Sequence, residues 1–113
     1  MVQYPSQLDR KFSALADPTR RSILGRLQEG SASISELAEP TGMSLTGIKK
    51  HVRILEEAEL VSTEKRGRTR HCQIDPKGFD EAGFWLEEFR RNWADRYDRL
   101  EKIIEQKKKE QEK

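Results

Sequence analysis

The chain has 113 residues, of which 37% are Asp, Glu, Lys or Arg, with a formal net charge of +2 and a single cysteine. This length allows one domain with a modest core, and one cysteine excludes an internal disulfide or a multi-thiolate metal site within one chain. No stretch has the pattern of a signal peptide or the length of a membrane span, so we expect a cytoplasmic protein with no membrane partner.

The charges are sorted along the chain, although their sum is small. The segment 49–53 contains two lysines and one arginine, and the segment 65–70 contains one lysine and three arginines, with no acidic residue in either. The last third of the chain mixes both signs. Because the net charge alone does not indicate a nucleic-acid partner, the positions of the basic residues must carry that inference.

Capping signals predict two helices at the start of the chain. Ser6 is a candidate N-cap for a first helix, in which Leu8, Phe12 and Leu15 recur at the spacing of one apolar face. Asp17 followed by Pro18 is typical of a second helix start, because the carboxylate accepts from a free backbone N–H and proline fixes φ. We expect this second helix to run to about residue 29 and to stop at the glycine at position 30.

A short third helix and a tight turn follow. Ser33 and Glu36 have the spacing of a capping box, and Pro40 should end or distort the helix within two turns. The next residues, 41–43, form a short connection with a central glycine. A glycine-containing connection of this length is typical of the turn between two crossed helices.

The fourth helix, capped by Ser44, has one apolar and one cationic face. On a helical wheel the apolar side consists of Leu45, Ile48, Val52 and Leu55, and the other side consists of Thr46, Gly47, Lys50, Arg53 and Glu57. A cationic face on an isolated helix is usually a solvated surface. Because this helix directly follows a short helix and a glycine turn, we interpret it as a DNA-recognition helix.

A basic hairpin is predicted after the recognition helix. One strand begins at Leu60, the segment 66–68 makes the turn, and the segment 69–74 returns, with Val61, Cys72 and Ile74 available to pack. Four cations near one turn repel one another unless an anion lies between them. DNA phosphates can supply that anion, and an arginine at the tip can enter a narrow minor groove.

Asp75 and Pro76 repeat the helix-start signal and open the longest helix. Counting heptads from Phe79 gives an apolar stripe to Ile103 that is interrupted only at Arg96. This stripe exceeds what so small a domain can cover, so we expect a partner surface, of which a second copy is the simplest. The alternative is that the helix folds back onto the first two helices.

These elements predict a single winged-helix domain over residues 1–113. It would comprise a core with helix-turn-helix and wing (8–75), a long dimerisation helix (76–105) and a frayed charged tail (106–113). The fold class is therefore mainly α with a small β-hairpin wing.

The motifs LADPTRRSIL, SISELAEPTGMS and TGIKKHVRILEEAELV, followed by a basic wing and a long aromatic helix, resemble the ArsR family of bacterial winged-helix repressors over about residues 8–104. The resemblance implies a homodimer joined by its first and last helices, which represses by covering an inverted-repeat operator in double-stranded DNA. The half-sites would then lie about one helical turn apart, roughly 34–36 Å.

The resemblance and the charge pattern together select candidate site residues. Major-groove contacts are assigned to Thr46, Lys50 and Arg53, with Gly47 allowing close approach. Phosphate contacts are assigned to Ser44, Lys49 and His51 and, on the wing, to Lys65, Arg66, Arg68 and Arg70. The candidate dimer interface consists of Leu8, Phe12, Phe79, Leu86, Phe89, Trp93, Tyr97 and Leu100.

The chain also departs from the family pattern. Its third helix, residues 34–40, lacks the Cys-x-Cys pair of many metal sensors, and its last helix contains no histidine, so metal sensing is the less favoured variant and no metal or cofactor is expected. Glu59 stands where family members usually carry glycine. If the backbone is left-handed there, the cost is about 1 kcal/mol.

Catalysis has no support in the sequence, because it contains no phosphate loop, paired carboxylates or nucleophile motif. We therefore expect a protein that is not an enzyme. The alternative function is a winged-helix interaction module whose basic face binds an acidic protein. An inducer could be a small-molecule effector at the dimer interface or an oxidant acting on Cys72, or there could be none, although a small buried side chain is the favoured role of Cys72.

Overall fold

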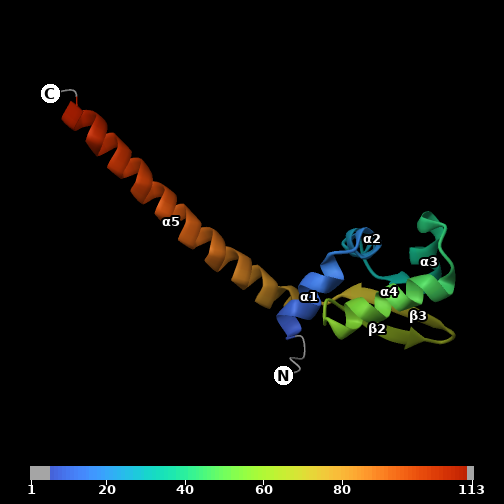
Figure 1. The fold of residues 1–113 in the computed structure, drawn as a ribbon. Helices are drawn as coiled ribbons and strands as arrows, with labels where there is room; N and C mark the ends of the chain where they lie inside the picture. Colours follow the sequence, from blue (N-terminus) through green and yellow to red (C-terminus); the bar gives the residue numbers. More distant parts are fainter. Residues whose placement is uncertain (1–5, 112–113) are drawn as a thin grey trace, which may run out of the picture. The chain divides into compact units, whose positions relative to one another are not determined.

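The computed structural model describes residues 6–111 and is mainly helical, with one small antiparallel sheet (Figure 1). It divides into two units between Ala82 and Gly83, which are described separately. The elements are α1 (Gln7–Leu15), α2 (Pro18–Leu27), β1 (Ala32–Ser33), α3 (Ile34–Ala38), η1 (Glu39–Thr41), α4 (Leu45–Glu57), β2 (Val61–Arg66), β3 (Thr69–Ile74), η2 (Pro76–Phe79) and α5 (Asp80–Gln111).

The first two helices start as their capping residues predict. The Ser6 hydroxyl accepts from the Asp9 backbone N–H at 3.2 Å, and the Asp9 carboxylate accepts in return from the Ser6 N–H at 3.3 Å. At the second start, the Asp17 carboxylate accepts from the Arg20 N–H at 3.1 Å, with Pro18 as the first helical residue. These bonds satisfy backbone donors that the helix itself leaves free.

The third helix starts at Ser33, but only half of the expected capping box forms. The Ser33 hydroxyl accepts from the Glu36 N–H at 3.1 Å and donates to the Glu36 carboxylate, so that carboxylate bonds the hydroxyl of Ser33 and not its backbone. Pro40 has the expected effect: α3 ends at Ala38, and the proline lies in the 3₁₀ turn η1 that follows.

The sheet has the order β1-β3-β2, so β3 is its central strand. The hairpin pairs Arg66 with Thr69, which leaves Gly67 and Arg68 as a two-residue turn, with φ of 61° at the glycine. This confirms the basic hairpin. The sequence did not predict β1, because a strand of two residues is too short to show an alternating pattern.

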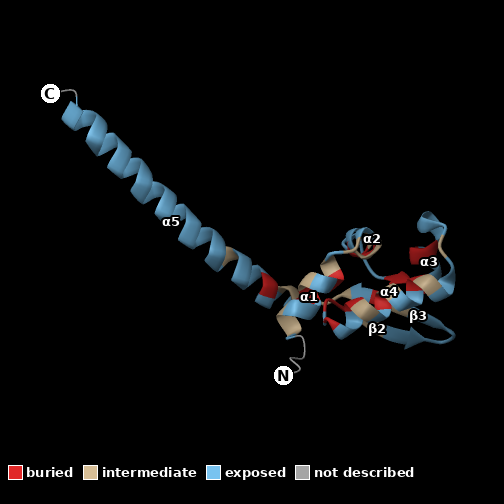
Figure 2. Cartoon of the chain, in the orientation of Figure 1, coloured by how far each residue is buried: buried red, intermediate tan, exposed pale blue. Residues whose placement is uncertain are grey.

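Ile48, Val52 and Leu55 of α4 are buried in the core of the first unit, as expected. Figure 2 shows buried segments on α4 next to exposed ones. The prediction that Leu45 belongs to this buried face is wrong, because its side chain is 48% exposed. On the helical wheel Leu45 lies at the edge of the apolar face, and its position in the first turn leaves it without cover. Leu60 and Cys72, both fully buried, also belong to this core.

In the connection after α4, Glu59 has φ of 62°, so of the conformations left open for this position the chain adopts the left-handed one without a glycine. The carbonyl oxygen of Glu59 faces Gly78, where an added Cβ would lie 1.7 Å from it. Real atoms cannot approach so closely. The segment after the wing can therefore pack against this connection only because residue 78 has no side chain.

The long helix α5 begins at Asp80, later than the start expected at Pro76, because residues 76–79 form a 3₁₀ turn capped by Asp75. It is helical to Gln111, whereas fraying was expected from residue 106, and the lysine, glutamate and glutamine residues of this end are good helix formers. No described helix is long and apolar enough to cross a membrane.

Most of the apolar stripe of α5 is exposed in the single chain (Figure 2). Leu86, Phe89, Trp93 and Leu100 are between 51% and 56% exposed. The Phe89 ring lies 6.4 Å from the Trp93 ring, centroid to centroid. The stripe is thus an exposed apolar and aromatic surface along the helix, interrupted at Arg96.

We predict that Gly78→Ala lowers the free energy of unfolding by more than about 2 kcal/mol, because the added methyl group displaces the Glu59 backbone. Gly83→Ala is the matched control, since its Cβ meets nothing within 4 Å, and it should stabilise α5 by up to about 1 kcal/mol. Urea denaturation at one fixed protein concentration measures both. Similar effects of the two substitutions would contradict the role given to Gly78.

Candidate nucleic-acid interface

The turn between α3 and α4 is held by side-chain hydrogen bonds. The Thr41 hydroxyl donates to the Ala38 carbonyl at 2.7 Å and accepts from the Met43 N–H at 3.1 Å. Gly42 has φ of 67°, a conformation that glycine adopts at little cost. The Ser44 hydroxyl then accepts from the Gly47 N–H at 3.1 Å and starts α4. Short-range bonds therefore fix the direction in which the second helix leaves the turn.

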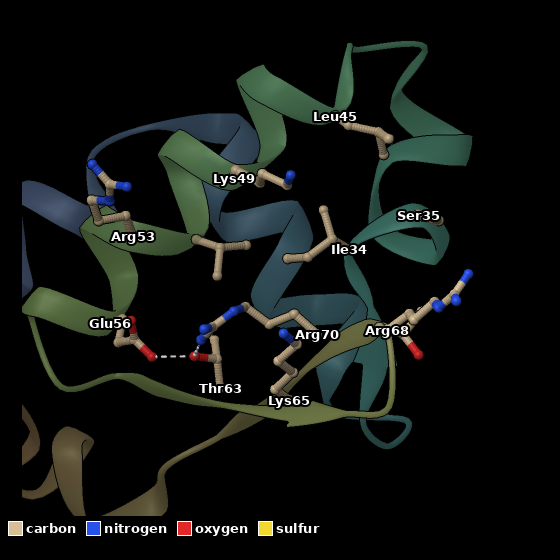
Figure 3. A pocket seen from close by; sticks show the side chains of 12 residues that line it. Ile34, Ser35, Leu45, Lys49, Arg53, Glu56, Thr63, Lys65, Arg68 and Arg70 are labelled. Carbon is tan, nitrogen blue, oxygen red and sulfur yellow. Dashed lines mark hydrogen bonds between the residues drawn. The ribbon is translucent and has the colours of Figure 1, made fainter.

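A groove of about 610 Å³ lies between the start of α3, the length of α4 and the wing (Figure 3). Its walls carry five basic side chains and one acidic side chain, above a floor that includes Ile34 and Val52. The basic residues are Lys49 and Arg53 from α4 and Lys65, Arg68 and Arg70 from the wing. Such a concentration of positive charge favours an anionic partner.

The groove is lined by one particular face of α4. Leu45, Lys49 and Arg53 are spaced by four residues and therefore lie along the same side of the helix, toward the wing. The other expected DNA-binding residues do not line the groove: Ser44, Thr46, Gly47, Lys50, His51 and Arg66. Of these, Thr46 and Lys50 are exposed on an adjoining face of α4.

A chain of hydrogen bonds joins the wing to α4, and sequence reasoning did not find it. The Arg70 guanidinium donates from Nη1 to the Thr63 hydroxyl at 2.6 Å, and that hydroxyl donates to the Glu56 carboxylate (Figure 3). These bonds hold the Arg70 side chain on the side of the hairpin that lines the groove. The three residues hold the wing at a defined distance from the recognition helix, and nothing in their sequence separation indicates that they meet.

Three expected DNA contacts also have roles within the fold. The Ser44 hydroxyl caps α4. A Cβ at Gly47 would lie 3.2 Å from the Met43 methyl carbon, so close packing within the turn also favours glycine there. The His51 ring is half-buried, and its Nδ1 lies 3.2 Å from a guanidinium nitrogen of Arg20.

Cys72 is fully buried in β3. Burial, and to a smaller extent the nearby Glu56 carboxylate, raises the pKa of the Cys72 thiol to about 11. A thiol with this pKa carries little thiolate at neutral pH, and thiolate is the form that reacts with oxidants. The geometry therefore supports the role of a small buried side chain and not that of a redox switch.

We predict that the Cys72 thiol does not react with a disulfide reagent in the folded protein at pH 8, where only about a thousandth of it is ionised. Denaturation in urea should restore a reaction of one thiol per chain. Absorbance of the released chromophore measures both states. Rapid modification of the folded protein would show that Cys72 is accessible and would reopen the redox alternative.

Within residues 6–111, no group of three or more His, Cys, Asp or Glu side chains is arranged to hold a metal ion.

A short helix, a glycine turn, an amphipathic second helix and a basic hairpin define a winged helix-turn-helix protein, and known proteins agree with this class. A family described as a helix-turn-helix domain matches residues 15–64. The HTH-type transcriptional regulator Rv2034 of Mycobacterium tuberculosis is 40% identical over 70 residues, which span 62% of this chain and 65% of that protein. The transcriptional repressor SdpR of Bacillus subtilis is 29% identical over 73% of this chain and 91% of its own length.

Solved structures identify the family. The crystal structure of the ArsR family transcriptional regulator RHA00566 matches with a TM-score of 0.74 and 47% identity, covering 83% of this chain and 97% of the other. The chain therefore belongs to the ArsR family of transcriptional regulators, which confirms the resemblance found in the sequence.

Proposed function

We propose that the protein is a sequence-specific DNA-binding transcriptional regulator that acts as a homodimeric repressor by covering an operator. The observation that carries this proposal is the convergence of five basic side chains from α4 and the wing on one groove. The recognition helix has 13 residues, a length of about 20 Å, which suits the major groove. The relatives named as a regulator and a repressor support the same function.

Each part of this surface has a distinct role in the proposed complex. Arg53 and Lys50 reach guanine edges in the major groove, and the Thr46 methyl group contacts thymine. Lys49 and the basic residues of the wing bind phosphates, which positions the protein on any sequence. The exposed side chain of Leu45, next to Thr46 in the sequence, adds a second apolar group to this surface. Base-reading groups thus come from α4, and phosphate-binding groups come from α4 and the wing.

The proposed homodimer rests on the exposed stripe of α5. Two leucines, one phenylalanine and one tryptophan of this stripe are each about half exposed, and burying such a side chain contributes about 1.5–3 kcal/mol. A second copy offers the same stripe, and two-fold pairing of identical surfaces is the commonest way to bury one. In α1, Leu8 and Phe12 would complete this interface. A dimer also places two recognition helices where an inverted repeat presents its half-sites.

Fluorescence anisotropy with DNA from upstream of the protein's own gene tests the proposed function, with scrambled DNA as competitor and salt varied. Preference for one sequence that survives the competitor, with affinity falling steeply as salt rises, is the expected result. The alternative, an acidic protein partner, predicts only weak and sequence-independent binding. If the upstream DNA binds no better than scrambled DNA, selection from genomic fragments decides whether any operator exists.

We predict that Arg53→Ala or Lys50→Ala costs about 1–3 kcal/mol on the preferred sequence and relaxes the preference at one base pair. Arg68→Ala, on the tip of the wing, is the matched comparison and should weaken preferred and random DNA by the same factor. Competition titrations with single-base variants of the site measure both. An equal loss on both kinds of DNA for Arg53→Ala would remove Arg53 from base reading.

We predict that Phe89→Glu weakens the dimer about 100-fold, because it places a charge in the middle of the apolar stripe. Ala94→Glu adds the same charge at an exposed position of α5 outside the apolar stripe and should weaken the dimer far less. Sedimentation equilibrium at several protein concentrations measures the dissociation constant. A dimer unaffected by Phe89→Glu would show that another surface joins the copies.

A further inference from the structure

Arg20, in the first turn of α2, closes the C-terminal end of α1. Its Nε donates to the Ala14 carbonyl at 2.8 Å, and its Nη2 donates to the Ser13 carbonyl at 3.2 Å. The Ser13 carbonyl also accepts from the Ala16 N–H at 3.2 Å. The two guanidinium bonds therefore add partners at the end of α1, where helix carbonyls lack their usual ones. The planar guanidinium holds both acceptors in one fixed geometry.

The third nitrogen of the same guanidinium reaches the recognition helix. Nη1 of Arg20 lies 3.2 Å from Nδ1 of His51, which is half-buried in the middle of α4. A guanidinium has donors and no acceptor, so Nδ1 must accept through its lone pair. A hydrogen bond in this direction places the ring proton of His51 on Nε2.

Asp17 holds Arg20 in this position. Its carboxylate accepts from the Arg20 backbone N–H, and this bond is the main reason that the pKa of Asp17 is lowered. The same carboxylate oxygen lies 4.0 Å from Nδ1 of His51. The negative charge of Asp17 therefore lies beside the Arg20 guanidinium and offsets its positive charge.

From these contacts we infer that Arg20 is a positioning residue that couples α1 to the recognition helix α4 through His51. In a dimer, this coupling sets the orientation of the two recognition helices toward DNA. The inference rests on the proposed function, in which α1 contributes to the dimer. A rotation of α1 carries its terminal carbonyls with it, and the rigid guanidinium transmits the change to α4. His51 then acts within the protein and not on a phosphate.

The neighbouring Arg21 is a matched control. Its Nη1 donates to the Leu15 carbonyl at 2.8 Å, so it also caps the end of α1, from an exposed position. Among the described residues, no hydrogen bond or ion pair joins Arg21 to α4. Arg21→Ala therefore removes one charge and one capping bond without touching the proposed coupling.

The test compares operator affinity for Arg20→Ala, Arg20→Lys, Arg21→Ala, His51→Ala and the Arg20→Ala, His51→Ala double variant. We expect about 10-fold losses for Arg20→Ala and His51→Ala, no further loss in the double variant and a change below about 3-fold for Arg21→Ala. A lysine ammonium cannot contact the Ser13 and Ala14 carbonyls and His51 in the planar geometry of a guanidinium, so Arg20→Lys should not restore binding. Equal losses for Arg20→Ala and Arg21→Ala, or losses that multiply in the double variant, would overturn the coupling.

A second measurement needs no DNA and no variant. Long-range ¹H–¹⁵N NMR of the unaltered protein identifies the protonated ring nitrogen of His51, and we expect an unprotonated Nδ1 and a protonated Nε2 at neutral pH. A proton on Nδ1 would overturn the inference even if Arg20→Ala failed to fold. Conversely, if the unaltered protein shows no sequence preference, the proposed function fails, and the tautomer still decides whether the Arg20 to His51 bond exists.

Discussion

Burial of one face of α4 is the constraint on which the rest of the surface depends. Ile48, Val52 and Leu55 are removed from water against the core, so the helix has only one rotation that satisfies its sequence. That rotation brings Lys49 and Arg53 to the groove and leaves the adjoining polar face exposed. The apolar residues therefore determine where the basic residues point.

The wing is placed by a different set of interactions, which converge on β3. This central strand pairs with β2 on one side and with β1 on the other, and Ser33 of β1 also caps α3. One residue thus belongs to both the sheet and the helix-turn-helix. The bonds from Arg70 through Thr63 to Glu56 add a second connection, at the far end of α4. The groove has a defined width because the wing is tied at both of these places.

Local signals in the sequence predicted most helix starts and the end of the third helix near Pro40, because capping residues and backbone restrictions act over three or four residues. The hairpin was predictable from its turn and its charges. Interactions between distant residues were not: β1 is too short to show a pattern, and the Arg20 to His51 contact joins positions 31 residues apart. Leu45 was misplaced because a helical wheel does not show where the core ends.

The central claim is that the DNA-contacting surface consists of the groove side of α4, its adjoining polar face with Thr46 and Lys50, and the wing. Mapping of backbone amide chemical shifts in ¹⁵N-labelled protein, titrated with its preferred DNA fragment, tests this most directly. Changes concentrated in residues 44–53 and 65–70, with little change along the exposed length of α5, are the predicted result. Changes centred on α5 or α2, with the wing unaffected, would contradict the claim.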